Sequence, residues 1–229
     1  NASVGTHNYT KNKAEDDWLA TIGWVQEGIG WYGMKTTAYM QGIDISEHNG
    51  DIDLTQYVNG FVIIRAAWGT NIDCKFLRNV QECERLGIPY GVYVYSYAEN
   101  DSEAAAEAQN MLAFLKQCHP TVGFWFDMED ADGFKAKHNV TDPALISSMC
   151  RSFCSTIKSN GYHVGVYASL TWFQNIISGV DEYDKWLAFW HYNDGTFTDA
   201  SSFGTSLHQF TSNPIDRDIM YVDISYFDK

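Results

Sequence analysis

The sequence has few basic residues and no long apolar run. Lysine and arginine number 15 against 29 aspartate and glutamate residues, which gives a formal net charge of −14. Proteins that bind nucleic acid or anionic membrane surfaces do so with an excess of positive charge, so we expect neither as a partner. No apolar stretch approaches the roughly 20 residues that a helix needs to span a bilayer.

Patterns for metals, phosphates and disulfide frameworks are also missing. The five cysteines are Cys74, Cys83, Cys118, Cys150 and Cys154, and their spacing matches no paired C-x-x-C template. No His/Cys/Asp cluster has the spacing of metal ligands, and no glycine-rich phosphate loop is present. We therefore expect no metal, no cofactor and full activity in a chelator. We interpret the cysteines mainly as small buried hydrophobes, and a Cys74–Cys83 bridge stays open.

The chain has enough apolar residues for a substantial core. Hydrophobic residues make up 45% and aromatic residues 15% of its 229 residues, and a chain of this length can form one large α/β domain or a domain with a small appendage. Eight tryptophans and fourteen tyrosines suit stacking on sugar rings, although core packing accounts equally well for most of them. The chain begins at Asn1 without methionine, and we take it as a mature form or a fragment.

From residue 41 onward, strand-like runs alternate with helical patterns. Runs typical of strands lie at residues 42–46, 60–67, 89–97, 122–129, 164–168, 186–190, 207–210 and 221–224. Helices are expected to follow residues 73, 101 and 142. This order predicts an α/β fold, a βα barrel whose later half has lost some helices. In such barrels the chemistry lies at the carboxyl ends of the strands.

One apolar run ends abruptly in acids. Asp127 and Glu129 share one face of the strand, roughly 6.6 Å apart at the backbone. Two carboxyls in one cleft suit acid chemistry on a glycosidic bond. A helix-capping loop entrance would also carry D-x-E, but the run before it is too apolar and aromatic for a surface loop. This spacing lies at the lower edge of the inverting range of about 6.5–9.5 Å and above the retaining value of about 5–5.5 Å. Substrate assistance by the N-acetyl group would escape this rule, so inverting, retaining and substrate-assisted stereochemistry all stay open.

The first 40 residues form a separate segment. Residues 1–20 are polar and predict a linker or a frayed end, whereas residues 21–33 predict two short aromatic strands around a turn at Glu27 and Gly28. This hairpin resembles one unit of the cell-wall-binding repeats of Gram-positive surface enzymes. Such repeats need neighbours to complete a ligand pocket, so a hairpin that merely covers a barrel end is an equal alternative. The expected domains are 1–40, linker and hairpin, and 41–229, barrel.

Several motifs resemble those of glycoside hydrolase family 25, in the right order, over roughly residues 41–229. They are the opening segment 42–50 (GIDISEHNG), the D-x-E at 127–129, the strand 208–212 (HQFTS), and the closing acids in 213–216 (NPID) and 222–223 (VD). His208 stands where the family usually has tryptophan, and the strand at 95–97 lacks the Y-H-[FY] of many relatives, so sugar contacts there can differ.

The resemblance implies an irregular (β/α)5β3 barrel and N-acetylmuramidase activity. Such lysozymes cut the β-1,4 bond between N-acetylmuramic acid and N-acetylglucosamine in bacterial peptidoglycan. The implied protein is secreted or cell-wall associated, and we expect a monomer.

Roles for the acids follow from the matching positions. The resemblance implies that Glu129 is the general acid, which requires a raised pKa, and Asp127 supplies a like charge for this. Asp127 would then stabilise the cationic centre or orient the N-acetyl group. Asp44 joins the cluster, and of two candidates for a fourth acid we prefer Asp216 to Asp223.

Other polar and aromatic residues follow strand ends and are candidate sugar contacts, although core packing is an alternative for each. They are Arg65, Tyr95, Tyr167, Trp190, Gln209 and, if it is not the fourth acid, Asp223. We interpret His48 as a residue that hydrogen-bonds beside the loop and holds Asp44.

Two other functions fit the sequence less well. A family 18 chitinase needs D-x-x-D-x-D-x-E, but counting back from Glu129 gives Asp127, Trp125 and Val122, so two acids are missing. A non-catalytic glycan-binding module would be indicated by the loss of Asp44 or Glu129, and both are present.

Overall fold

The computed structural model describes residues 13–22, 39–114 and 118–228. The chain forms two compact units, Asn1–Ala38 and Tyr39–Lys229. In the described ranges, no helix is long and apolar enough to cross a membrane.

The described part of the first unit is a helix, α1 (Lys13–Thr21). Residues 13–20 are helical where we expected a linker or a frayed end, and Thr21 is helical where the hairpin was expected to start. Alanine, leucine, lysine and glutamate in this segment are good helix formers, which accounts for the difference. Residues 23–33 of the predicted hairpin lie outside the described residues.

The second unit is a closed barrel of mostly parallel strands. Its strands are β1 (Met40–Ile45), β2 (Phe61–Trp68), β3 (Asn71–Ile72), β4 (Tyr90–Tyr95), β5 (Phe124–Asp127), β6 (Val164–Ser169), β7 (Asp184–Ala188), β8 (Leu207–Thr211) and β9 (Arg217–Met220). The sheet runs in the order β1-β9-β8-β7-β6-β5-β4-β2-β3, and a further pairing between β1 and β2 closes it. β9 is antiparallel to both of its neighbours, β8 and β1. The predicted irregular α/β barrel is confirmed.

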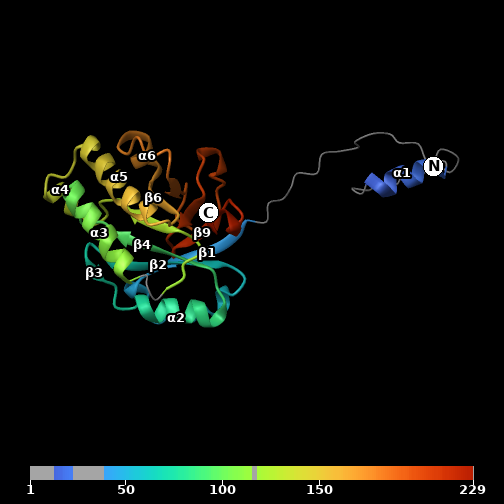
Figure 1. The fold of residues 1–229 in the computed structure, drawn as a ribbon, viewed down its shortest axis with the longest axis horizontal. Coiled ribbons are helices and arrows are strands. Elements are labelled where there is room, and N and C mark those ends of the chain that lie inside the picture. The colour runs from blue at the N-terminus through green and yellow to red at the C-terminus, as the bar shows by residue number, and fades with distance from the viewer. Residues whose placement is uncertain (1–12, 23–38, 115–117, 229) are drawn as a thin grey trace. The chain divides into compact units, whose positions relative to one another are not determined.

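Helices cover the earlier strands and are nearly absent from the later ones. They are α2 (Phe76–Leu86), α3 (Asp101–Phe114), α4 (Phe134–Lys137), α5 (Pro143–Ser159) and α6 (Leu170–Asn175), with short 3-10 helices η1 (Glu47–Asn49), η2 (Leu54–Tyr57), η4 (Ser201–Phe203) and η5 (Ile224–Asp228). Figure 1 shows α2, α3, α5 and α6 packed around the strands. Over residues 184–220, all of which the structure describes, no α-helix connects β7 to β8 or β8 to β9.

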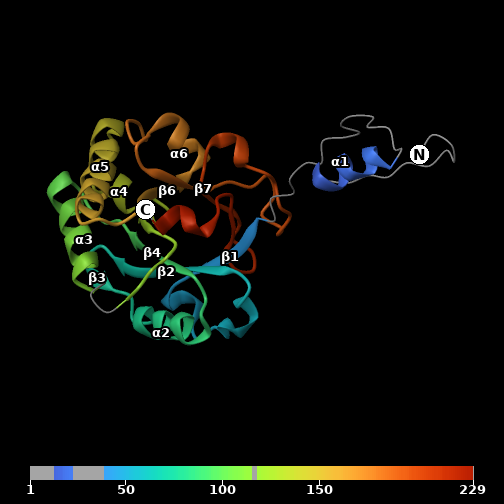
Figure 2. The same cartoon turned by 45° about the vertical axis from the view of Figure 1, so that its right-hand side comes forward.

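Both faces of the strands are buried, as expected for a parallel sheet under helices. Outward side chains such as Phe126 pack under the helices, here stacked on Phe153 of α5. Inward side chains fill the barrel with a second apolar cluster that includes Trp125 and Trp186. Phe227 of η5 joins this cluster edge-on to Trp125. In Figure 2 the C-terminal segment, drawn in red, lies across the centre of the ring of strands and helices.

The last strand differs from its prediction. We expected it at residues 221–224, but β9 occupies Arg217–Met220, and the chain after it leads into η5. The charged pair Arg217-Asp218 makes β9 look unlike a buried strand, whereas the later segment is more apolar. Asp218 is nevertheless completely buried in the barrel.

All five cysteines are free thiols. Four of them are buried, as the interpretation of small buried hydrophobes predicts, and Cys74 is exposed. The Cys74–Cys83 bridge that stayed open is therefore not formed.

Candidate active site

Five carboxyl groups meet at the carboxyl ends of the parallel strands. Asp44 lies in β1, and β5 ends at Asp127 with Glu129 two residues later. Because β9 is antiparallel, its start lies at the same end, and it brings Asp216 and Asp218 into the group. In the register of the sheet, Asp218 is opposite Gly42 of β1 and Gln209 of β8.

Glu129 is the partly exposed acid beside the end of β5. Burial raises its pKa to about 7, and the charges of Asp216, Asp132 and Asp130 contribute in the same direction. We expected this repulsion to come from Asp127. The structure instead assigns it to these three acids, because Glu129 itself raises the pKa of Asp127.

Asp127 is fully enclosed at the end of β5. Its Oδ1 atom is buried and has no hydrogen-bond partner among the described residues. Burial, followed by the charge of Glu129, raises the pKa of Asp127 well above its usual range, and Lys135 and Arg65 act against this rise. Asp127 and Glu129 therefore interact electrostatically, and the pKa values of both carboxyls are raised.

Asp44 is held by a chain of side chains. Gln209 donates from Nε2 to Asp44 Oδ2 over 2.7 Å, and the Tyr167 hydroxyl donates to Gln209 Oε1 over 2.8 Å. These three candidate residues therefore lie together. His48 does not take the expected part, since it lies exposed in η1 and its backbone N–H bonds to Ser46.

Asp218 was not predicted as a site residue. Trp186 donates from Nε1 to Asp218 Oδ1 over 2.7 Å, while Oδ2 is buried without a donor from the described part of the chain. Burial raises the pKa of Asp218 to about 7, and the neighbouring Asp44, whose pKa is also raised, is close enough to share a proton with it. The alternation of side chains along β9 could have predicted Asp218 as a site residue, because Asp218 and Met220 both face the interior of the barrel.

The arrangement of an acidic cluster in such a barrel agrees with a family match. The sequence profile of glycosyl hydrolases family 25 matches residues 43–219. This chain belongs to glycosyl hydrolases family 25. It is accordingly a glycoside hydrolase of the lysozyme type. A second profile, for a domain of unknown function (DUF5648), matches residues 1–45.

Relatives support the same assignment. A probable GH family 25 lysozyme 2 from Dictyostelium discoideum is 27% identical over 181 residues, which cover 74% of this chain and 81% of that protein. The modular autolysin LytC of Streptococcus pneumoniae matches with a TM-score of 0.67 and 26% identity, over 83% of this chain and 48% of LytC. The bacterial lysozyme of Streptomyces coelicolor has the same fold, with a TM-score of 0.64 and 19% identity over 83% of this chain and 96% of that one.

The rim of this family 25 site carries aromatic side chains. The hydroxyl of Tyr97 donates to Asp132 over 2.5 Å, and that of Tyr95 to the same carboxylate over 3.4 Å. Trp190 follows β7 and packs, half-buried, against the inner apolar cluster. Tyr95 and Trp190 thus lie at the end of the barrel that holds the acidic cluster, and their contact with sugars stays a prediction.

Two of the candidate sugar contacts, Arg65 and Asp223, do not lie among the acids of the cluster. Arg65 is buried, and its guanidinium donates to Asp73 over 2.8 Å and to Glu47 over 3.2 Å. These bonds join the segments that follow β1 and β3, and the charge of Arg65 still lowers the pKa of Asp127. Asp223 follows the antiparallel β9, so it lies at the opposite end of the barrel, exposed and bonded to Ser225. The structure does not bring Asp223 to the acidic cluster.

One group in the described ranges has metal-ligating atoms close together: Glu47, Asp73 and Cys74. Arg65 and backbone N–H groups already donate to these two carboxylates. These carboxylates therefore form an ion pair with Arg65, and we infer no metal site from them.

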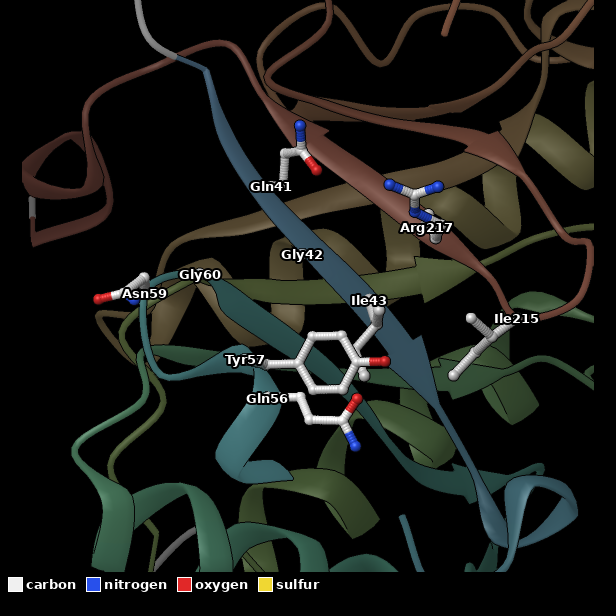
Figure 3. Close-up of a pocket in the computed structure, with 9 residues that line it drawn as sticks. All are labelled: Gln41, Gly42, Ile43, Gln56, Tyr57, Asn59, Gly60, Ile215 and Arg217. Carbon is white, nitrogen blue, oxygen red and sulfur yellow. The ribbon is translucent and has the colours of Figure 1, made fainter. Parts of the chain in front are cut away.

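A cavity of about 290 Å³ lies outside the barrel wall, between η2 and β9 (Figure 3). It is lined by Gln41, Gly42, Ile43, Gln56, Tyr57, Asn59, Gly60, Ile215 and Arg217. Ile215 and Arg217 alternate with Asp216 along the chain, and Asp216 is not among the lining residues. The cavity is therefore separate from the carboxyl cluster.

Proposed function

We propose that this enzyme is an N-acetylmuramidase with Glu129 as its general acid. It hydrolyses the β-1,4 bond between N-acetylmuramic acid and N-acetylglucosamine in bacterial peptidoglycan. The observation that carries the proposal is the state of Glu129, a carboxyl at the strand ends that remains partly exposed and whose pKa is raised to about 7. An acid of this strength still holds a proton near neutral pH and can give it to the leaving oxygen.

The neighbouring acids take complementary roles. Asp127 lies two residues before Glu129 and, when ionised, stabilises the positive charge that develops at the sugar or orients the N-acetyl group. Asp216 keeps the pKa of Glu129 high through its charge. Asp44 is fixed by Gln209 and lies on the first strand, where it completes the group of acids.

The comparisons support peptidoglycan as the substrate class. The Dictyostelium relative is named a probable lysozyme, and the Cpl-1 endolysin, which shares the fold at 22% identity and a TM-score of 0.65, was solved with a peptidoglycan analogue. The match covers 81% of this chain and 55% of Cpl-1. We further propose that residues 41–229 form the catalytic domain, since the family profile lies within them.

Analysis of released fragments tests the proposal. We expect Gram-positive cell walls to lose turbidity and mass spectrometry to find muramic acid at the new reducing ends. Reducing N-acetylglucosamine ends would indicate a different bond specificity. Binding to walls without any release would contradict hydrolysis and favour a glycan-binding module.

A further inference from the structure

The cavity outside the barrel wall is lined by an arginine that has no partner. Arg217 is half-buried at the start of β9, and no residue in the described ranges forms a hydrogen bond or an ion pair with its guanidinium. The guanidinium lies over the ring of Phe210, 5.1 Å from the ring centre. This contact holds one face of the group and leaves its N–H donors, which point outward in its plane, available to an acceptor from solvent.

The side chains around Arg217 come from two strands and a short helix. Arg217 and Ile43 are directly opposite each other in β9 and β1, so both point out of the barrel, and Gln41 shares their face two residues earlier. Figure 3 shows Gln56 and Tyr57, from η2, on the other side of β1 from Arg217. No described residue forms a hydrogen bond with the Tyr57 hydroxyl or the Gln41 amide. The cavity therefore offers several polar groups that the protein itself does not use.

These groups fit a peptide that carries a carboxylate. A guanidinium binds a carboxylate through two parallel N–H···O bonds. The Gln41 amide and the Tyr57 hydroxyl both donate and accept, which suits the polar groups of a peptide bond, and Ile43 and Ile215 supply apolar contact. Arg217 is the one cation among the described lining residues, and the net charge of −14 repels a polyanion such as a chain of phosphates.

The cavity lies one strand away from the catalytic acids. Asp216 acts by its charge on Glu129, whereas its neighbours in sequence, Ile215 and Arg217, line the cavity. In peptidoglycan a short peptide, the peptide stem, is attached to muramic acid, the sugar that the proposed reaction places at the acids. A stem of five residues spans at most about 17 Å, which exceeds the roughly 10 Å thickness of a sheet. A substrate bound at the acids therefore holds its stem within reach of the cavity.

We propose that this cavity binds a carboxylate of the peptide stem, with Arg217 as the residue that anchors it. The inference rests on the proposed function, because muramic acid carries the stem. Attachment to the bound glycan raises the effective concentration of the stem to the millimolar range, so even a weak contact contributes to substrate binding. Arg217 is thus a specificity-determining residue that favours glycan with stems over glycan without them.

Kinetics on two substrates test the inference with the full chain. One substrate is glycan that carries its peptide stems, and the other is the same glycan after an amidase has removed them. In Arg217→Gln we expect the ratio of kcat/KM for the first to that for the second to fall about tenfold, mainly through KM, because the charged bond to the stem is lost. Arg217→Lys keeps the charge without the fork and should recover part of the ratio.

Lys185→Gln is the matched control for these kinetics. Lys185 is a cation held over the ring of Phe173, 5.8 Å from the ring centre, and is not among the residues that line the cavity. Its removal should leave the ratio unchanged. An unchanged ratio in a folded Arg217→Gln protein would overturn the inference.

An NMR titration measures binding without any activity, and it tests the inference even if Arg217→Gln does not fold. A synthetic stem pentapeptide with free carboxylates should shift the Arg217 Nε–H signal, and the fully amidated pentapeptide should bind at least about tenfold more weakly. Tyr57→Phe, which removes one hydroxyl, should weaken binding about threefold. Tighter binding of glycerol phosphate than of the pentapeptide would overturn the choice of ligand.

The two measurements distinguish this inference from the proposed function. If the wild type releases muramic acid ends but binds both pentapeptides equally, the inference fails and the proposed function stands. If it releases no such ends but binds the free pentapeptide through Arg217, the proposed function fails and the carboxylate site stands.

Discussion

The two ends of the barrel interior are built from the same strands and differ in what they bury. Towards the amino ends of the parallel strands the barrel is filled by large apolar side chains, among them Phe61 and Trp125. At the carboxyl ends the inward positions include the acids Asp44, Asp127 and Asp218, with Tyr167 and Gln209 beside them. The change occurs within single strands: β5 presents Trp125 and then Asp127 on the same face, and β9 presents Asp218 and then Met220.

The difference shows how the packed end determines the chemistry of the acidic end. Burial is the leading cause of the raised pKa at Asp44, Asp127, Glu129, Asp216 and Asp218. The aromatic layer keeps water from the acids on one side, and the cost of ionising them rises accordingly. We therefore expect changes at the acidic end to alter turnover and pH dependence, and changes at the packed end to alter stability.

The largest effect is expected at Glu129. Glu129→Gln preserves the shape and removes the proton that is donated, so turnover on cell walls should fall at least about a hundredfold while the protein folds normally. Glu182→Gln removes an exposed acid that pairs with Lys158 and should leave turnover unchanged. Near-normal turnover of Glu129→Gln would remove this residue from the mechanism.

Asp216→Asn should shift the pH profile. Asp216 is the foremost charge that raises the pKa of Glu129, so its removal should lower that pKa below about 7. Activity is lost as the pH rises through the pKa of the acid, and the basic limb should therefore move to lower pH, with turnover about tenfold lower. Asp223→Asn changes an exposed acid at the opposite end and should leave this limb in place. A shift in Asp223→Asn instead would assign the fourth acid to Asp223.

At the packed end, Trp125→Phe should cost stability. It removes the bond from Trp125 Nε1 to the oxygen of Val122, 2.8 Å long, and leaves a void in the inner cluster. We expect a loss of about 1–3 kcal/mol in the free energy of unfolding, measured by denaturant titration. Trp68→Phe, at an exposed tryptophan, should change it by less than about 0.5 kcal/mol. Equal losses of stability in the two variants would contradict the role of Trp125 in the inner apolar cluster.

The smallest effect, and one of opposite sign, is expected for Asp218→Asn. The pKa of Asp218 is about 7 in the folded protein and near its ordinary value of 3.8 when unfolded, so the folded state binds the proton more tightly. The stability due to this proton is present at low pH and is lost as the pH rises through about 7. Asparagine avoids this loss, which the shift from 3.8 to about 7 limits to about 4 kcal/mol at pH 8, but it gives up the proton shared with Asp44. We therefore expect a net gain of about 1 kcal/mol at pH 8 and none near pH 4.

An exposed acid, Asp199, provides the control for the predicted gain in stability at pH 8. Hydrogen bonds from Ser201 lower the pKa of Asp199, so Asp199→Asn should not stabilise the protein at pH 8. Thermal melting of both variants at the two pH values measures the difference. A destabilised Asp218→Asn at pH 8 would show that this carboxylate is a net contributor to the fold.

Local patterns were sufficient for the parallel part of the barrel. The run that ends at Asp127 is apolar and uninterrupted, and Asp44 lies near the end of a shorter strand; the structure places both at the carboxyl ends of strands. β9 is four residues long and begins with two charged residues, so its buried character depends on β1 and β8, which flank it. For this reason the sequence did not identify Asp218 as a site residue, and the strand was predicted at residues 221–224, after its actual position.

The environments of Arg65 and Lys135 could not be predicted either, because their partners are distant in the sequence. Arg65 was recognised as a polar residue at a strand end, but its partners Asp73 and Glu47 come from two different loops. A lysine in a short surface-like helix gives no sign of burial. Lys135 is enclosed because α3 carries Glu107 beside it and the chain after β4 supplies an oxygen for it.

The distribution of the thiols makes the enzyme easy to label at one place. Cys74 is the exposed cysteine among five and follows the β2–β3 hairpin, where its N–H donates to Glu47, three residues beyond Asp44. A maleimide fluorophore attached there would report on glycan arriving at the catalytic end, without prior removal of the four buried thiols. The carboxylate of Glu47 raises the pKa of the Cys74 thiol, so the coupling reaction should proceed faster above pH 8 than at neutral pH.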